Sequence, residues 1–268
     1  MVIELIEPKQ KQLELNDKIK VTKIQLAAIC HLIDHFGWSD MILNHVSAKI
    51  PEGHTDTFLM NPYGLLYDEI TASSLVEVDF AGNQVDKSSL PVNKPGSILH
   101  STIYQARSDI NAVIHTHTPY GVALSMLEEG LILNDQMSMI FHNKIGYHDF
   151  EGIITSPAEK SRIAENLADN KCLILRNHGL VATGKSIAEA FWNYYYLEFA
   201  CKTQILALST GKKINAVTTA IKDTTFKQHE RFGSKEAPTT SNNLSGNFEA
   251  MLTSLMRMLD RKKVKYKE

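Results

Sequence analysis

Two histidines two positions apart, His115 and His117, are the first candidates for chemistry in this sequence. Val113 and Ile114 stand directly before them, and their β-branched side chains predict a buried strand. Side chains of a strand alternate between its two faces, so both imidazoles point the same way. Two imidazoles on one face of a stiff backbone form half of a site for a divalent metal. The other interpretation is that both are hydrogen-bonded polar residues at a strand end.

The best third ligand is His178. The apolar runs 172–175 and 180–183 predict two paired strands, joined by a tight turn that contains His178. We expect Gly179 to supply the positive φ that such a turn demands. His178 is then held at a strand end in the same manner as the first two histidines.

Three imidazoles with open coordination positions are typical of a catalytic zinc site. Mn²⁺, Fe²⁺, Co²⁺ and Ni²⁺ also accept imidazole ligands, so the ligand type leaves the metal open. Such a metal polarises a carbonyl group and stabilises an enediolate, or it lowers the pKa of a bound water. Enediolate chemistry also needs a base, for which a carboxylate close to the metal is the natural choice.

Composition indicates an ordinary globular protein. The chain has 268 residues, of which 43% are hydrophobic and 22% charged, and its net charge is −2. These values permit a sizeable core and give no basic field to attract nucleic acid or an anionic membrane. The sequence has neither a membrane-spanning apolar run nor a secretory signal. Cys30, Cys172 and Cys201 lie far apart and predict reduced thiols. We therefore expect a cytoplasmic protein with no nucleic-acid or membrane partner.

Short strands and helices surround these histidines in the predicted secondary structure. Residues 1–21 predict a loosely tied N-terminal arm, and residues 23–36 have the apolar spacing of a helix that stops at Gly37. A helix over 98–107 is predicted to have Ser97 as its N-cap. Between these helices the sequence predicts a strand at 44–51, another at 58–60, a turn at 61–64 and a hairpin at 74–85.

The second half of the chain is predicted to hold two long helices. Ser156 caps a helix over 157–169, and the helix over 187–208 begins with a capping box. Aromatic residues around the circumference of the second helix favour its burial against another surface, such as a second subunit. The remaining chain is predicted to form a loop or linker over 211–247 and a C-terminal helix with a basic tail over 248–268.

Four short motifs follow one another along the chain: Asn44-x-x-Ser47-x-Lys49, Asn61-Pro62-x-Gly64, His115-x-His117 and Asn177-His178-Gly179. Over about residues 22–210 the chain resembles the class II aldolase/adducin family, which contains sugar-phosphate aldolases, a pentose-phosphate epimerase and the adducin head domain. The resemblance implies one α/β domain with three layers, α/β/α, around a central, mainly antiparallel sheet. It also implies zinc on the three histidines and a homotetramer with sites near the subunit interfaces.

Position 96 departs from the aldolase pattern. Aldolases of this family carry there a glutamate that is the catalytic acid/base, preceded by serines that help to hold phosphate. This chain has Gly96, within Lys94-Pro95-Gly96-Ser97. The Pro-Gly pair and the Asn-Pro-Tyr-Gly turn are closer to the adducin-like branch, whose heads are regarded as non-catalytic but have generally lost the metal histidines. The sequence therefore keeps the aldolase metal ligands and lacks the aldolase base.

Other residues are weaker candidates for the site. The candidates for a substitute base are His100, Asp149 and Tyr266, the last as a C-terminal tyrosine that reaches a neighbouring active site. His100 is also a candidate to complete the coordination. The candidates for substrate binding are Asn44, Asn61, Gly64, Lys94 and Ser97. Turn formation explains Asn61 and Gly64 equally well, and Lys94 is as readily a solvated lysine.

Two functions remain open from the sequence. The first is a metal-dependent aldehyde-lyase of class II aldolase type, or a related decarboxylase, that acts on a small carbonyl compound such as a sugar phosphate. The second is a non-catalytic, adducin-like binding or assembly module with a structural or vestigial metal and a cytoskeletal partner. Three correctly spaced ligands favour the first, because a purely structural module has little need for an open site. The missing glutamate favours the second, or a different reaction.

Overall fold

One mixed sheet lies at the centre of the computed structural model, which describes residues 3–51, 56–154, 157–233 and 244–268. Its strands are β1 (His45–Lys49), β2 (Thr57–Met60), β3 (Val76–Asp79), β4 (Ala112–Thr116), β5 (Ile145–His148), β6 (Cys172–Leu175) and β7 (Gly179–Gly184). The helices are α1 (Ile3–His35), α2 (Lys94–Ala106), α3 (Pro119–Ser125), α4 (Pro157–Leu167), α5 (Ile187–Ser209), α6 (Thr219–Gly233) and α7 (Leu244–Arg261). Two short 3₁₀ turns are η1 (Tyr67–Glu69) and η2 (Ser138–Phe141).

The strand order is β3-β2-β1-β4-β7-β6-β5. Neighbouring strands are antiparallel except β5 and β6, which are parallel. The prediction of a mainly antiparallel sheet is therefore confirmed. In its centre β4 pairs with β1 on one side and with β7 on the other, so the strand that carries His115 is flanked on both sides.

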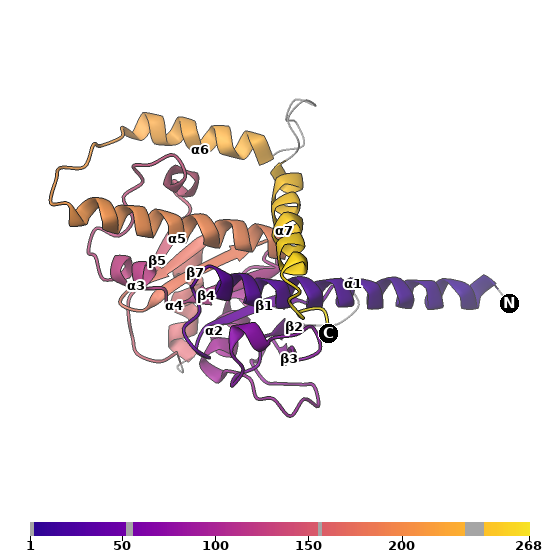
Figure 1. Ribbon diagram of the computed structural model, residues 1–268. Helices are drawn as coiled ribbons and strands as arrows, with labels where there is room; N and C mark the ends of the chain where they lie inside the picture. The colour runs from indigo at the N-terminus through magenta and orange to yellow at the C-terminus, as the bar shows by residue number, and fades with distance from the viewer. Residues whose placement is uncertain (1–2, 52–55, 155–156, 234–243) are drawn as a thin grey trace.

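Two hydrophobic clusters lie on opposite faces of this sheet. Along β4, Ile114 belongs to the cluster that contains buried residues of α1 and α5, whereas Val113 belongs to the cluster with residues of α2 and α4. The alternation follows from the period of two in a strand. Figure 1 shows α1 and α5 on one side of the sheet and α2 on the other. The three-layer α/β/α architecture is confirmed.

The turn between β6 and β7 differs from the prediction in one detail. The residue with positive φ is Asn177, at +57°, and not Gly179. Gly179 is already paired with Leu175 in the sheet. A Cβ at position 179 would lie 2.5 Å from the carbonyl oxygen of Thr116 on β4. The glycine is thus needed for the close approach of β7 to β4 rather than for the turn itself.

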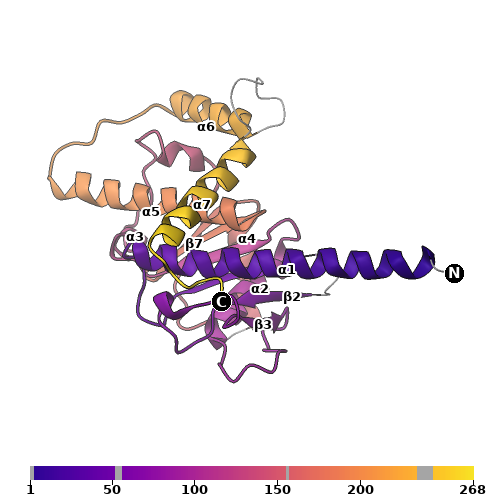
Figure 2. The same ribbon diagram turned by 45° about the vertical axis from the view of Figure 1, so that its right-hand side comes forward.

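At three places the structure has more helix than the sequence predicts. The predicted arm over 1–21 is helical from Ile3 onward and continuous with the next helix in α1, because its Glu, Lys, Gln and Leu residues are good helix formers. Figures 1 and 2 show its N-terminal part extending beyond the rest of the chain. The predicted loop over 211–247 is wrong for Thr219–Gly233, which forms α6. Helix α2 begins before Ser97, since Asn93 is its N-cap. The predicted cap Ser156 lies outside the described residues.

The C-terminal tail is anchored to its own chain. Tyr266 is fully buried in the cluster that covers one face of the sheet, and its hydroxyl donates to Asp260 Oδ1 at 2.9 Å. The backbone N–H of Ala72 donates to the carbonyl oxygen of Tyr266 at 2.9 Å. Tyr266 is therefore a core residue, and the expectation that it reaches a neighbouring active site is wrong.

Among the described helices, none has the length and apolar character to cross a membrane.

We expect Tyr266→Ala to lower the free energy of unfolding by about 3 kcal/mol or more, because it removes a buried ring and leaves a cavity. Tyr266→Phe keeps the ring and removes one partly exposed hydrogen bond, so its effect is about 1 kcal/mol or less. Urea unfolding followed by circular dichroism measures both variants. Equal stability of the alanine and phenylalanine variants would contradict the anchoring role of the ring.

Candidate metal centre

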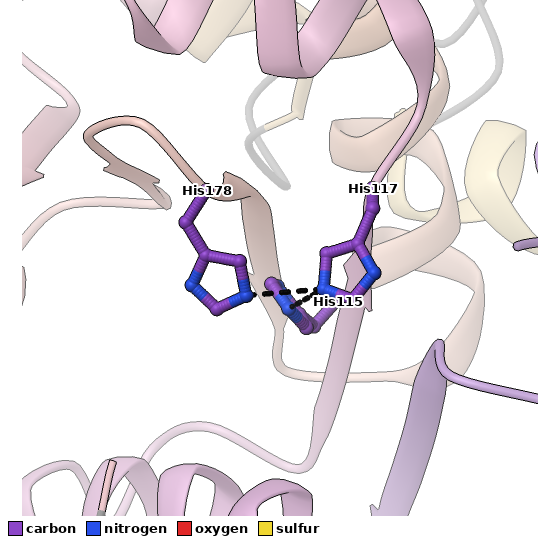
Figure 3. A group of neighbouring side chains, drawn as sticks. All are labelled: His115, His117 and His178. Carbon is purple, nitrogen blue, oxygen red and sulfur yellow. Dashed lines mark hydrogen bonds between the residues drawn. The ribbon is translucent and has the colours of Figure 1, made fainter. Parts of the chain in front are cut away.

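The three predicted ligands meet at one end of the sheet. His115 is in β4, His117 follows its end, and His178 comes from the turn between β6 and β7 (Figure 3). Nε2 of His117 lies 2.9 Å from Nε2 of His115 and 3.0 Å from Nε2 of His178. One ligand nitrogen from each residue lies within 4.8 Å of the others. Antiparallel pairing of β4 with β7 causes this convergence, because it places the turn before β7 beside the end of β4.

The second ring nitrogens determine what the cluster can bind. Nδ1 of His115 faces the carbonyl oxygen of Leu180 at 2.9 Å, and Nδ1 of His117 faces Asp40 Oδ2 at 3.0 Å. Both oxygens only accept hydrogen bonds, so both Nδ1 atoms carry the proton. In the neutral rings each Nε2 then presents a lone pair toward the cluster. A cation between the two Nε2 atoms, which lie 2.9 Å apart, would accept both lone pairs.

A proton is a poor candidate for that cation near neutral pH. Burial lowers the pKa of His115 well below its ordinary value, and the neighbouring imidazoles lower it further. Burial also lowers the pKa of His178 to about 4, with a contribution from His117. The donor set of three imidazole nitrogens, two of them oriented by a carbonyl or carboxylate contact at the second nitrogen, fits a divalent transition metal.

A cavity of about 470 Å³ opens at the three histidines. Its size lies in the range of about 300–1,000 Å³ that is usual for small-molecule sites. Pro95 and Leu99 of α2 line the cavity, and so do Phe150 and Ile153, which follow β5. None of the described residues that line it is an aspartate or glutamate. The cavity thus combines a metal-ligand floor with mainly apolar walls.

The two asparagines predicted to bind substrate, Asn44 and Asn61, form hydrogen bonds to backbone groups. The side chain of Asn44 donates to the carbonyl oxygen of Trp38 at 2.8 Å and accepts from the backbone N–H of His117 at 3.1 Å. Asn61 Oδ1 accepts from the N–H of Val46 at 2.8 Å. Both are buried and hold strand ends in place, and neither lines the cavity. Gly64 also lies off the cavity wall, with a φ of +101° that identifies it as a turn residue.

Lys94 and Ser97 lie at the start of α2, where they were predicted to bind substrate. Lys94 lines the cavity, but its Nζ donates to the carbonyl oxygen of Gly82 at 2.8 Å and to Asn83 Oδ1 at 3.1 Å. Ser97 is buried off the cavity wall, and its hydroxyl is within hydrogen-bond distance of the Gly82 and Lys94 carbonyl oxygens. Both side chains therefore fix the helix to the turn after β3.

None of the three predicted substitute bases lines the cavity. Tyr266 is in the core, and Asp149 has a side chain that is 90% exposed, 3.6 Å from Arg176. His100 is fully buried on α2, behind the cavity wall. Its Nε2 pairs with His45 Nδ1 at 2.8 Å, and its Nδ1 pairs with the hydroxyl of Ser47. His100 is therefore not a member of the ligand cluster.

His45 lines the cavity and was not among the candidates predicted from the sequence. It is paired with His115 across β1 and β4, with ring centroids 4.7 Å apart, and it lines the cavity. Its neighbours Asn44 and Ser47 belong to a recognised motif, but His45 stands at one of the variable positions. The signal that would have found it is the register of β1 on β4, which local sequence patterns do not contain.

Comparison with known proteins agrees with this architecture. Residues 24–205 match the family described as "Class II Aldolase and Adducin N-terminal domain". The chain belongs to this family. A protein from Caulobacter vibrioides, whose name proposes a class 2 aldolase, is 44% identical over 190 residues, which are 71% of this chain and 74% of that protein. Alpha-adducin from Rattus norvegicus is 43% identical over 195 residues, 72% of this chain but only 26% of the length of adducin.

Solved structures of the family extend the likeness beyond the matched residues. An aldolase II superfamily protein from Pseudomonas syringae superposes with a TM-score of 0.85 at 35% identity, covering 94% of this chain and 96% of the other. An L-fuculose 1-phosphate aldolase from Glaciozyma antarctica superposes with a TM-score of 0.78 at 25% identity, covering 95% and 94%. The fold is thus shared with proteins whose names describe both aldolases and adducins.

Asp40 is the outer partner that fixes the tautomer of His117. We expect Asp40→Ala to weaken zinc binding about 10- to 100-fold, since outer partners of metal-binding histidines typically contribute that much. Competition with a chromogenic zinc chelator measures the affinity. Asp68→Ala, which removes an exposed carboxylate from η1, is the matched control and leaves the affinity unchanged. An unchanged affinity in the Asp40 variant would refute this orienting role.

Helix α5 carries a buried carboxylate, Glu198, close to the end of β4. Thr118, next to His117, donates to Glu198 Oε2 of α5 at 2.5 Å, and Thr116 pairs with the hydroxyl of Tyr194. Burial raises the pKa of Glu198 to about 7, partly offset by the Thr118 hydrogen bond and the charge of Lys202. This network fixes the backbone of the ligand-bearing strand to α5.

The raised pKa of Glu198 predicts a pH effect of defined sign. Between the unfolded value near 4.5 and the folded value of about 7, the folded state binds more protons than the unfolded state. Its stability therefore falls as pH rises through this window. The variant Glu198→Gln lacks this titration. The difference in free energy of unfolding between the variant and the parent should therefore shift in favour of the variant by about 2–3 kcal/mol from pH 4.5 to 8. Urea unfolding at several pH values measures it, and the exposed Glu128→Gln is the control. Parallel curves for parent and Glu198→Gln would contradict the prediction.

Proposed function

We propose that this protein is a metal-dependent lyase of class II aldolase type that acts on a small carbonyl compound. A sugar phosphate or a related decarboxylation substrate is of the chemical class we expect. The observation that carries the proposal is the convergence of three Nε2 atoms, two of which are set as lone pairs by contacts at Nδ1. Zn²⁺ is the proposed ion, with Mn²⁺, Fe²⁺, Co²⁺ or Ni²⁺ as alternatives of the same ligand preference.

The roles of the residues follow from their contacts. His115, His117 and His178 would hold the metal, which when bound supplies a Lewis acid that polarises a carbonyl group. Asp40 and the Leu180 carbonyl oxygen orient two of these rings, and Asn44 holds the backbone of His117. The apolar walls of the cavity exclude water from a bound substrate and strengthen electrostatic interactions there.

The similarity to an L-fuculose 1-phosphate aldolase supports a small phosphorylated carbonyl substrate. Exposed apolar side chains at the mouth of the cavity, Phe150 at 57% and Ile153 at 72% exposure, support burial in a homo-oligomer, which we propose to be a tetramer. Three free, buried cysteines are compatible with a reducing, cytoplasmic location.

A second function is a non-catalytic binding module like the head of adducin. The specific observation in its favour is the absence of a carboxylate from the described cavity wall, together with 43% identity to alpha-adducin. In that case the partner is cytoskeletal and the metal is structural or vestigial. The two functions differ in one measurable property, which is metal-dependent turnover of a carbonyl compound.

We expect the purified protein to contain close to one zinc ion per chain and to catalyse hydrogen exchange or cleavage of carbonyl compounds, with dihydroxyacetone phosphate as the first probe. His178→Ala loses both properties, and His142→Ala, a ring paired with Asp223 on α6, keeps both. Elemental analysis and proton NMR in deuterated water measure them. The enzymatic proposal would be contradicted if the protein contains no metal and His115→Ala leaves its stability unchanged. Bound metal without turnover of aldol or decarboxylation substrates would favour the adducin-like function.

A further inference from the structure

We propose that His45 is the proton-transfer residue of this site and that His100 positions it. The inference rests on the proposed lyase function and supplies the group that the chain lacks at position 96. In the step assigned to it, a C–H bond next to the substrate carbonyl breaks. Its electron pair forms a C=C bond while the carbonyl π electrons move onto oxygen, and the proton passes to Nε2 of His45. The reverse step returns that proton to carbon.

The position of His45 follows from strand pairing. His45 in β1 and His115 in β4 stand opposite each other in the antiparallel register, so their side chains share one face of the sheet. Their ring centroids are 4.7 Å apart. His45 is 5% exposed and lines the same cavity as the three metal ligands. A substrate carbonyl polarised at the metal centre would therefore lie beside this ring.

Gly96 makes room for this ring. A Cβ added at position 96 would lie 2.6 Å from Cδ2 and 2.8 Å from Cγ of His45, closer than real Cβ contacts. Any side chain at position 96 would therefore start in the volume that the imidazole fills. Gly96 is in the first turn of α2, which forms a wall of the cavity. A titratable side chain from β1 thus occupies the space next to the metal ligands that a side chain from α2 would otherwise occupy.

A buried hydrogen-bond chain fixes the orientation of His45. Its Nδ1 pairs with His100 Nε2 at 2.8 Å, His100 Nδ1 pairs with the hydroxyl of Ser47, and that hydroxyl pairs with the hydroxyl of Tyr104 at 2.7 Å. If Nδ1 of His45 carries the proton, its Nε2 is a lone pair and acts as a base. If His100 Nε2 carries the proton, Nε2 of His45 is the donor and acts as an acid. A base oriented by a second buried group is the usual arrangement in catalytic relays.

The other polar residues of the cavity wall are less suited to this role. Asn93 caps α2 through its side chain, and Lys94 Nζ is bound to the turn after β3. Tyr63 is 38% exposed at the rim. His45 is outside the three-residue ligand cluster, and within the described residues its side-chain hydrogen bond uses Nδ1 and leaves Nε2. It is therefore the buried ring nitrogen on this wall that remains available to a substrate.

The test compares zinc-loaded parent protein with His45→Gln and His100→Asn. Glutamine can keep a hydrogen bond to His100 but cannot relay a proton. We expect His45→Gln to retain zinc content and affinity while the rate of deuterium exchange into dihydroxyacetone phosphate falls about 100-fold or more. His100→Asn retains zinc and lowers kcat about 10-fold with little change in KM, as a positioning residue should. His142→Gln, remote from the cavity, is the control.

Each other outcome is decisive. Loss of zinc in His45→Gln would make His45 a ligand and overturn the proposal. Undiminished exchange in that variant would overturn it and leave the lyase function intact. Absence of turnover of aldol and decarboxylation substrates by the zinc-loaded parent protein would remove the lyase function, and the role of His45 with it.

A second measurement does not depend on activity. Gly96→Glu should lower Tm by about 3–10 °C, because the new Cβ meets the His45 ring. His45→Ala in the same chain should recover at least half of that loss, because it empties the shared volume. A double variant no more stable than Gly96→Glu alone would contradict the exchange of space between positions 45 and 96. If the double variant also regains exchange activity, the carboxylate and the imidazole are interchangeable at this place.

Discussion

The pairing of β4 with β7 is the constraint on which the site depends. Thr116 stands opposite Leu180, and the turn that carries His178 is therefore fixed beside the end of β4. Strand β7 also supplies the Leu180 carbonyl oxygen that sets the tautomer of His115. Gly179 allows the approach, since a Cβ there would meet the Thr116 backbone at 2.5 Å. One strand pair thus positions the third ligand and orients the first, so a shift of register would lose both.

Buried polar contacts extend this constraint away from the ligands. Asn44 bonds to the backbone at His117 from the β1 side, and Glu198 bonds to Thr118 from α5 on the opposite face. A buried polar network favours one arrangement only when all its members are paired. The backbone around His117 is therefore fixed from two layers of the domain, and Asn44, predicted to bind substrate, is one of its two supports. Rigid support of this kind is what a preorganised metal site needs.

Sequence patterns predicted the features that depend on local order. The period of a strand placed His115 and His117 on one face, and two apolar runs around a turn placed His178. The motif order predicted the layered fold. By contrast, the position of His45 beside the ligands depends on the register between β1 and β4, which pairs it with His115, 70 positions away in sequence. The polar composition before and along α6 predicts a loop, but the segment forms a helix. Its Asp223 and Glu230 form ion pairs with His142 and Lys171 of the domain. The burial of Tyr266 likewise depends on a pocket built by distant elements.

The number of ligand residues separates the two candidate functions. Structural zinc sites are usually closed by four protein ligands, whereas catalytic sites have three protein ligands and an open position. The cluster in the described residues contains three histidines, and its nitrogens border a cavity of about 470 Å³. Two lone pairs 2.9 Å apart repel each other, and a bound cation would relieve this repulsion. A module that only binds a partner gains nothing from such a centre, because any apolar residues of similar volume would pack there without that cost. A three-histidine centre beside a cavity, with the buried imidazole of His45 next to it, supports the proposed chemistry on a small molecule.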